Sequence, residues 1–202
     1  MDAAPSAAGA CRAAIPRALS RALYRRSELR GEHARLDAPP WADETSRLIP
    51  KYRDVDAVAA CLPWRVCAQY RFRETSHINL QETRAVRNEM RAHCRRHGCS
   101  KPQLLLLLSD SRVCIGAVAK GRSSSFKLNG ILRSLTSWLV LGDLSLGMLW
   151  VSTSANPADD TSRFVRLRRP PPPPSWARKY FGIASARPAP TCRAAGAAAA
   201  SQ

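Results

Sequence analysis

The chain has 202 residues, of which 32 are Lys or Arg and 15 are Asp or Glu, so its formal net charge is +17. This length suits one domain with tails, and the basic excess indicates a polyanionic partner, most often nucleic acid. The longest apolar stretch, residues 130–151, contains Arg133 and Asp143, which argues against a membrane span. Because no apolar signal segment opens the sequence, we expect an intracellular protein, in the nucleus or cytoplasm, with reduced cysteines.

The two ends of the chain differ in composition from its middle. Residues 1–50 are rich in Ala, Arg, Ser and Pro, which predicts a disordered basic leader, with a transit peptide as the alternative. Residues 166–202 contain the run Pro170–Pro174, typical of a stiff extended spacer, and then an Ala-rich end. This composition predicts a disordered tail. The structured domain is therefore expected within residues 51–165.

The first half of this domain predicts a strand, a helix and a strand. Residues 64–73 are rich in strand-forming side chains. Residues 79–98 have apolar side chains at helical spacing, with Asn79 as the expected N-cap and Gly98 as the stop. Residues 103–110 form a continuous apolar run of strand length, which is typical of a central strand buried on both faces.

The second half predicts two helices, a strand and a terminal helix. Residues 111–121 and 126–142 have helical patterns, and residues 144–152 resemble another buried strand. Pro157 suits the first turn of a last helix. The order of elements predicts an α/β domain with a mixed sheet flanked by helices.

Acidic residues occupy the places where such a domain usually carries its function. Glu82 falls in the first turn of the first predicted helix, Asp110 ends the central strand, and Asp159 and Asp160 open the last helix. Function gathers at the carboxyl ends of parallel strands, so these carboxylates are expected to converge there. Converging carboxylates repel unless a cation such as Mg²⁺ or Mn²⁺ neutralises them, and two such ions can support phosphodiester cleavage. The alternative is that Asp159 or Asp160 only caps a helix.

Three stretches resemble a known family. Residues 77–86 read HINLQETRAV, residues 104–133 contain the segments LLLLLSD and KGRSSS, and residues 149–163 read LWVSTSANPADDTSR. Together they resemble the ribonuclease H domain of retroelement polyproteins, in particular of DIRS-type retrotransposons, across residues 71–163. The resemblance implies a ribonuclease H-like fold and a reverse transcriptase-associated endonuclease. Its activity would be hydrolysis of the RNA strand of RNA–DNA hybrids.

The resemblance also implies roles for individual residues. Glu82, Asp110 and Asp159 match the family's catalytic carboxylates, which hold Mg²⁺ or Mn²⁺, and Asp160 is an additional neighbour in the metal site. The family has a fourth carboxylate, an Asp on its first strand, but residues 62–73 contain no acidic side chain. The first strand is therefore expected to be truncated. The candidates for the missing ligand are Asp160, Asp54 and Asp56.

A basic segment between the two middle helices is the predicted contact with nucleic acid. The expected contacts are Lys120, Arg122, Ser123, Ser124 and Lys127. Recognition of a hybrid would rest on its backbone shape and its 2′-hydroxyl groups. The alternative is an ordinary solvated loop. For the whole chain, the alternatives to an active enzyme are a catalytically inactive nucleic-acid-binding module and a non-functional retroelement fragment.

Overall fold

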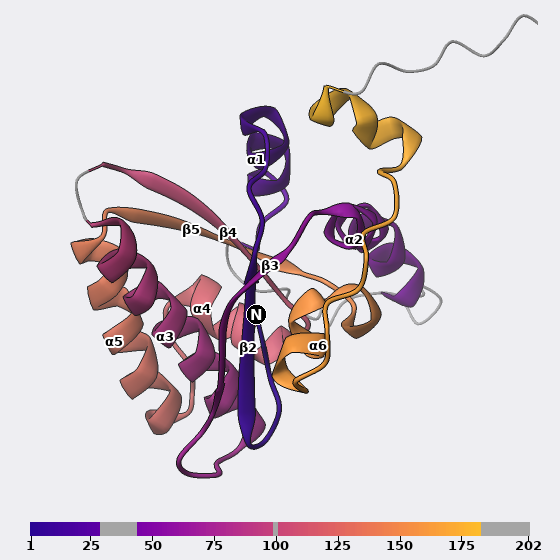
Figure 1. Cartoon of the computed structure of the whole chain (residues 1–202). Coiled ribbons are helices and arrows are strands. Elements are labelled where there is room, and N and C mark those ends of the chain that lie inside the picture. Colours follow the sequence, from indigo (N-terminus) through magenta and orange to yellow (C-terminus); the bar gives the residue numbers. More distant parts are fainter. Residues whose placement is uncertain (29–43, 99–100, 183–202) are drawn as a thin grey trace, which may run out of the picture.

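The computed structural model describes residues 1–28, 44–98 and 101–182, and it has an α/β architecture, as predicted (Figure 1). The strands are β1 (Asp2–Ala3), β2 (Ala7–Arg12), β3 (Arg65–Arg71), β4 (Gln103–Ser109) and β5 (Leu144–Trp150). The α-helices are α1 (Arg17–Tyr24), α2 (Glu44–Cys61), α3 (Ile78–His97), α4 (Arg112–Lys120), α5 (Phe126–Leu141) and α6 (Pro157–Ser162). Two 3₁₀ helices, η1 (Thr153–Ala155) and η2 (Ser175–Phe181), complete the described elements.

The strands form two small sheets rather than one continuous mixed sheet. In the first, β1, β2 and β3 pair antiparallel in that order, with Asp2 opposite Gly9 and a register shift after Ala10. In the second, β4 and β5 pair parallel along their full length. The sheets meet at β1, where the Met1 ammonium nitrogen donates to the Leu108 carbonyl oxygen at 2.8 Å.

The expectation of a disordered leader is wrong for residues 1–28, which contain β1, β2 and α1. Most alanines of the hairpin are part of the core: the buried ones are Ala3, Ala7, Ala8 and Ala10. Their size lets the β1–β2 hairpin pack closely against the helices around it. The remaining leader residues 29–43 lie outside the described part of the chain.

Apolar residues lie on both faces of the β4–β5 sheet, as the leucine run predicts. Leu105 and Leu107 face the largest core cluster, which contains side chains from α3, α4 and α5. Leu106 and Leu108 pack against a second cluster on the opposite face, built from Leu19 and Leu23 of α1 with Val55, Val58 and Leu62. The sheet is therefore the middle layer between two groups of helices. Among the described residues, no helix has the length and apolarity needed to cross a bilayer.

Helix boundaries follow their caps. The His77 side chain accepts from the Asn79 amide at 3.3 Å, so α3 begins before the predicted cap at Asn79, and Glu82 lies beyond its first turn. Ser111 and Ser125 cap α4 and α5 with their hydroxyl groups, and Gly121, at φ 67°, ends α4 in the left-handed conformation. These helices form where their sequence patterns predict them.

The chain after residue 166 is also partly built into the fold. Residues 165–174 have no regular hydrogen-bonded structure, but η2 follows them, and its Ala177 is fully buried. Tyr180 and Phe181 pack against the cluster formed by α1 and α2. The prediction of a disordered tail is therefore wrong for residues 166–182, and residues 183–202 lie outside the description.

Close packing of β2 against α6 depends on one glycine. A Cβ atom at Gly9 would lie 2.5 Å from the Ser162 backbone nitrogen and 2.7 Å from the Ala158 carbonyl oxygen. Both neighbours are backbone atoms of α6, so neither can rotate away as a side chain would. The missing side chain at Gly9 is what allows α6 to lie directly on the hairpin.

Gly9→Ala should therefore lower the free energy of unfolding by about 1–3 kcal/mol, the usual cost of overpacking. Gly130→Ala in α5 is the control, because a Cβ at Gly130 meets nothing within 4 Å. In a helix interior this change should stabilise by about 0.5–1 kcal/mol. Chemical denaturation measures both, and equal effects of the two substitutions would contradict the proposed contact.

Candidate functional site

Four carboxylates from separate parts of the chain interact through their charges. Asp2 is on β1, Glu82 on α3, Asp110 directly after β4, and Asp159 in the first turn of α6. Burial is the main cause that raises the pKa of Glu82 and of Asp2; the charges of Asp110 and Asp2 add to the rise at Glu82, and those of Asp110 and Asp159 add to the rise at Asp2. Each of the three predicted catalytic residues is thus coupled by charge to Asp2, an acid that was not predicted.

Glu82 is the most perturbed carboxylate of this group. Burial is the main cause that raises its pKa to about 7, the charges of Asp110 and Asp2 add to the rise, and the Ser111 hydroxyl opposes it. Its Oε2 atom is buried and has no hydrogen-bond partner. An unsatisfied carboxylate oxygen of this kind is stabilised by a proton or by a cation.

Asp2 is buried in the β1–β2 hairpin. Its carboxylate accepts a hydrogen bond from the Ser162 hydroxyl of α6. Burial raises the pKa of Asp2, the Ser162 bond lowers it, and the Asp110 and Asp159 charges raise it further. Sequence reasoning missed Asp2 because the alanine-rich context was assigned to the leader.

A signal for this strand was nevertheless present in the sequence. Asp2 is an isolated acid, and the residues after it, Ala4 to Ala7, contain a Pro-Ser pair that is typical of a turn. In the structure, Ala4 and Ala7 close the hairpin through their backbone, with N–O distances of 2.8 and 3.4 Å. A turn signal between two stretches of small residues therefore marked the hairpin.

Asp110 is held from three sides. Its Oδ2 accepts from the Thr153 hydroxyl at 2.9 Å, and its Oδ1 accepts from Asn156 Nδ2 at 3.3 Å. The Trp150 indole nitrogen donates to the Asp110 backbone carbonyl at 3.1 Å. The carboxylate is thus fixed in place by the segment that follows β5.

Asn156, the first residue of the NPAD motif, connects the pieces of the site. It is fully buried, and its Nδ2 also reaches the Met1 carbonyl oxygen at 3.4 Å. Its Oδ1 accepts from the Ala158 amide at 3.1 Å, which caps α6. One side chain therefore joins β1, the end of β4 and the start of α6.

The two acids of α6 have different partners. Asp159 Oδ1 accepts from Arg163 Nε at 2.9 Å within the helix, and its charge also acts on Asp2. Asp160 Oδ2 pairs with Arg168 Nε at 2.8 Å, in the segment that follows the helix. The predicted metal ligand Asp160 is therefore occupied in an ion pair.

Asp54 and Asp56 lie on α2, not on a strand, so neither supplies a first-strand carboxylate. Asp54 forms a surface ion pair with Arg26 at 2.7 Å. Asp56 Oδ1 accepts from the Ser152 amide at 2.8 Å and so supports the loop that carries Thr153. Both acids therefore have a partner within the protein, and neither lies on the first strand, where the resemblance would require the fourth carboxylate.

The donor set suits a hard cation, but its members are spread out. Among residues 1–28, 44–98 and 101–182, no three His, Cys, Asp or Glu side chains form a group that could hold one metal ion. Protein side chains donate hydrogen bonds to three of these carboxylates instead: Ser162 to Asp2, Thr153 and Asn156 to Asp110, and Arg163 to Asp159. The unpartnered Glu82 Oε2 and the all-oxygen chemistry of the four acids are the features that fit Mg²⁺ or Mn²⁺.

The predicted nucleic-acid segment is an ordered loop with an exposed basic surface. Asn129 brackets Ser123, accepting from its backbone nitrogen at 2.8 Å and donating to its carbonyl at 2.7 Å. The Ser123 hydroxyl accepts from the Ser125 amide, so it serves the loop itself. The exposed side chains are Lys120, Arg122, Ser124 and Lys127, beside Phe126, which is 85% exposed.

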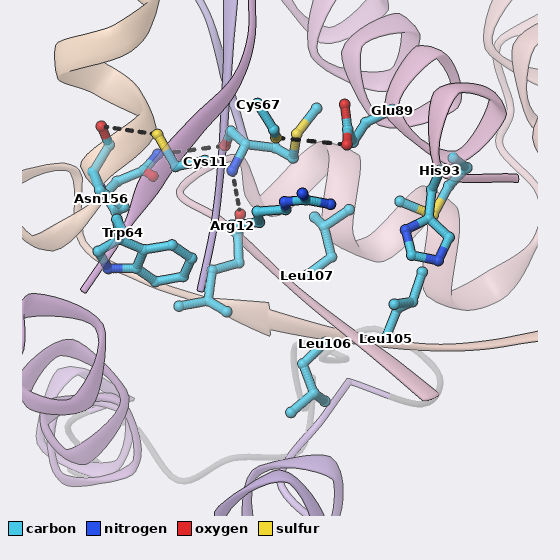
Figure 2. Close-up of a pocket in the computed structure, with 14 residues that line it drawn as sticks. Cys11, Arg12, Trp64, Cys67, Glu89, His93, Leu105, Leu106, Leu107 and Asn156 are labelled. Carbon is cyan, nitrogen blue, oxygen red and sulfur yellow. Dashed lines mark hydrogen bonds between the residues drawn. The ribbon is translucent and has the colours of Figure 1, made fainter. Parts of the chain in front are cut away.

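A cavity of about 110 Å³ lies between β2, β3, β4 and α3. Figure 2 shows it with Trp64 and Asn156 at one end and Glu89 and His93 at the other. Two thiols line the cavity, those of Cys11 and Cys67. Burial is the main cause that raises the pKa of each, and the pKa of Cys67 reaches about 12. Thiols in this state are protonated at neutral pH and do not act as nucleophiles.

Comparison with known proteins adds no independent assignment. No protein-family model, no curated protein and no solved structure matches the chain.

Glu82→Gln tests the electrostatics of the site. Since the pKa of Glu82 is raised from 4.5 to about 7, the folded protein keeps a proton that the unfolded chain releases between these values. Ionised Glu82 therefore destabilises the fold as the pH rises. We expect Glu82→Gln to match the parent protein at about pH 4 and to be more stable by about 1–2 kcal/mol at about pH 8, after allowance for solvent screening.

The measurement is the free energy of unfolding across this pH range in the presence of a chelator. Glu74→Gln, which removes an exposed glutamate from the loop before α3, is the matched control for the loss of one charge. A difference between Glu82→Gln and the parent protein that stays constant with pH would contradict the raised pKa.

Proposed function

We propose that this chain is a retroelement-derived ribonuclease H-type domain that cleaves the RNA strand of RNA–DNA hybrids with the help of Mg²⁺ or Mn²⁺. The observation that carries the proposal is the electrostatic coupling of Asp2 with Glu82, Asp110 and Asp159, which come from separate parts of the chain. Four neighbouring acids are unexpected in a chain of net charge +17, unless a cation and a polyanionic substrate use them.

The arrangement of elements supports the same proposal. The fold that the sequence resembles begins with three antiparallel strands. Here β1, β2 and β3 pair antiparallel in this order, with α1 and α2 inserted between β2 and β3. The helices α3, α4 and α5 then alternate with the parallel strands β4 and β5. Asp2 on the first strand completes the set of four acids that the resemblance implies.

Within this proposal the carboxylates would share the metal ions. Asp2, Glu82, Asp110 and Asp159 would hold them, and the ions would supply an activated water and charge stabilisation at the scissile phosphate. Thr153 and Asn156 orient Asp110 through its two carboxylate oxygens. Arg163 holds Asp159 and would release it when a cation takes over the neutralisation of its charge.

The basic loop would hold the substrate. Lys120 at the end of α4, Arg122 on the loop and Lys127 in the first turn of α5 are exposed. Because Asn129 holds the loop backbone at Ser123, these basic side chains project from an ordered backbone and can pair with phosphates. Phe126 would offer an apolar face to a sugar or base next to these charges.

A second candidate is a catalytically inactive module that binds nucleic acid. The observation that favours it is that Asp2, Asp110 and Asp159 are each engaged by protein side chains, and no three acids converge on one point among the described residues. In this case the basic surface would function without the chemistry, and binding would be independent of divalent cations.

A cleavage assay distinguishes the two candidates. On a labelled RNA–DNA hybrid with Mg²⁺ or Mn²⁺, Asp110→Asn and Asp2→Asn should each reduce the cleavage rate by about 100-fold or more, because each removes a metal ligand. Asp54→Asn, which removes an acid of the surface pair with Arg26, should cleave at the parent rate.

Each outcome of this assay has a definite meaning. Cleavage retained by both Asp110→Asn and Asp2→Asn would contradict the assignment of the site. A folded parent protein that binds the hybrid but does not cleave it with either metal would favour the inactive module.

Binding of the hybrid tests the basic loop separately. Replacing Lys120, Arg122 and Lys127 with Gln should weaken binding and reduce the slope of log K against log salt by up to about 3 × 0.9. The control replaces with Gln three exposed arginines in and directly after α1, namely Arg17, Arg21 and Arg25, so that both variants lose the same charge. Equal losses in the two variants would mean that net charge, not the loop, holds the substrate.

A further inference from the structure

The segment between α6 and η2 contains five consecutive prolines, Pro170–Pro174. Each proline ring fixes its own φ near −65°, and a residue that precedes proline is restricted to extended conformations. Every residue from Arg169 to Pro173 precedes a proline, so the whole run is confined to the polyproline II helix. Pro174, with φ −59° and ψ 152°, has this conformation.

This helix is exposed over most of its length. Residues 169–172 are exposed, whereas Pro173 and Pro174 are half-buried. A polyproline II helix has no internal hydrogen bonds, so its carbonyl oxygens are available to donors from outside. The prolines therefore present both apolar rings and hydrogen-bond acceptors to a partner.

Both ends of the run are anchored to the fold. On the N-terminal side, Arg168 donates to Asp160 Oδ2 at 2.8 Å, to the Asn156 carbonyl at 3.1 Å and to the Ser154 carbonyl. On the C-terminal side, the Ala177 amide donates to the Pro174 carbonyl at 2.9 Å, and Ala177 is buried. Figure 1 shows the segment passing α2 between α6 and η2.

Anchoring matters because it lowers the cost of recognition. A free proline-rich tail loses chain entropy when it binds, but a run fixed at both ends has lost most of that entropy already. The five residues span about 15 Å at 3.1 Å per residue. A preformed ligand of this length matches the proline-binding grooves of small recognition domains.

The side chains around the run define the chemistry of that partner. Trp176 is 42% exposed two residues after the last proline, and Val165 is 57% exposed before the first. Arg166 and Arg169 are exposed beside them. Apolar rings flanked by arginines fit a groove that is lined with aromatic side chains and bordered by carboxylates.

We infer that residues 165–176 are a docking site for a polyproline-recognising domain of the SH3 type, with an acidic rim beside its aromatic groove. Pro170, Pro171 and Pro172 insert their rings between the aromatic side chains of the groove. Arg169 pairs with the acidic rim. This inference is independent of the proposed nuclease activity, because no residue of the carboxylate group takes part.

The test is binding of the full chain to an array of purified SH3 domains, followed by titration calorimetry of each domain that binds. The variant replaces Pro170, Pro171 and Pro172 with Ala and should weaken binding by about tenfold or more, because Ala has no fixed φ. The control replaces three other exposed prolines, Pro16, Pro63 and Pro102, with Ala and should bind as the parent does. A second variant, Arg169→Gln, should weaken binding severalfold.

Three results would overturn the inference. One is that no domain of the array binds at concentrations up to about 1 mM. The proline run would then only support the fold, and a lower stability of the triple proline variant would agree with that role. Another is that the triple proline variant binds as tightly as the parent. The third is that an RNA–DNA hybrid displaces every bound domain, and that Arg169→Gln lowers the affinity for the hybrid but not the affinity for the domains. The segment would then be a nucleic-acid contact.

Discussion

The buried amide of Asn156 is the interaction on which the rest of the structure depends. Its hydrogen bonds reach the Met1 carbonyl, the Asp110 carboxylate and the Ala158 amide, so three elements distant in sequence share one side chain. A buried amide that lost any of these partners would carry an unsatisfied polar group, at a cost of about 1–3 kcal/mol. The position of Asp110 relative to the first strand is therefore coupled to the stability of the domain.

The same coupling explains why acidic residues can gather in so basic a chain. Ser162 donates to Asp2, and Thr153 and Asn156 donate to Asp110, so protein donors take part of the negative charge that a cation would otherwise neutralise. Glu82 lacks such compensation at Oε2, and burial raises its pKa to about 7. Glu82 therefore carries the least compensated negative charge of the four acids, and protonation relieves it.

Much of the α/β order could be predicted from the sequence, because α3 to α6 and both parallel strands have clear periodicity and caps. The strand β3 of the first sheet was also predicted, but the β1–β2 hairpin was not, since the alanines of β2 carry no amphipathic pattern and pack closely against α6. Asp2 was lost from the predicted site for that reason. The predicted mixed sheet is two sheets in the structure, β1–β2–β3 and β4–β5. The partners of Asp54, Asp56 and Asp160 depend on tertiary contacts that local spacing does not encode.

The five leucines of β4 have a consequence for the register of the sheet. Because five leucines follow one another and pack on both faces of the sheet, a slip by one residue still places a leucine at four of the five leucine positions, so the hydrophobic contacts distinguish poorly between neighbouring alignments. The alignment must then be set at the end of the strand. The Val151 amide donates to the Ser109 carbonyl at 3.0 Å, and Trp150, Thr153 and Asn156 hold the next residue, Asp110. The hydrogen bonds at Ser109 and Asp110 thus fix the register of β4, which its leucines leave poorly specified.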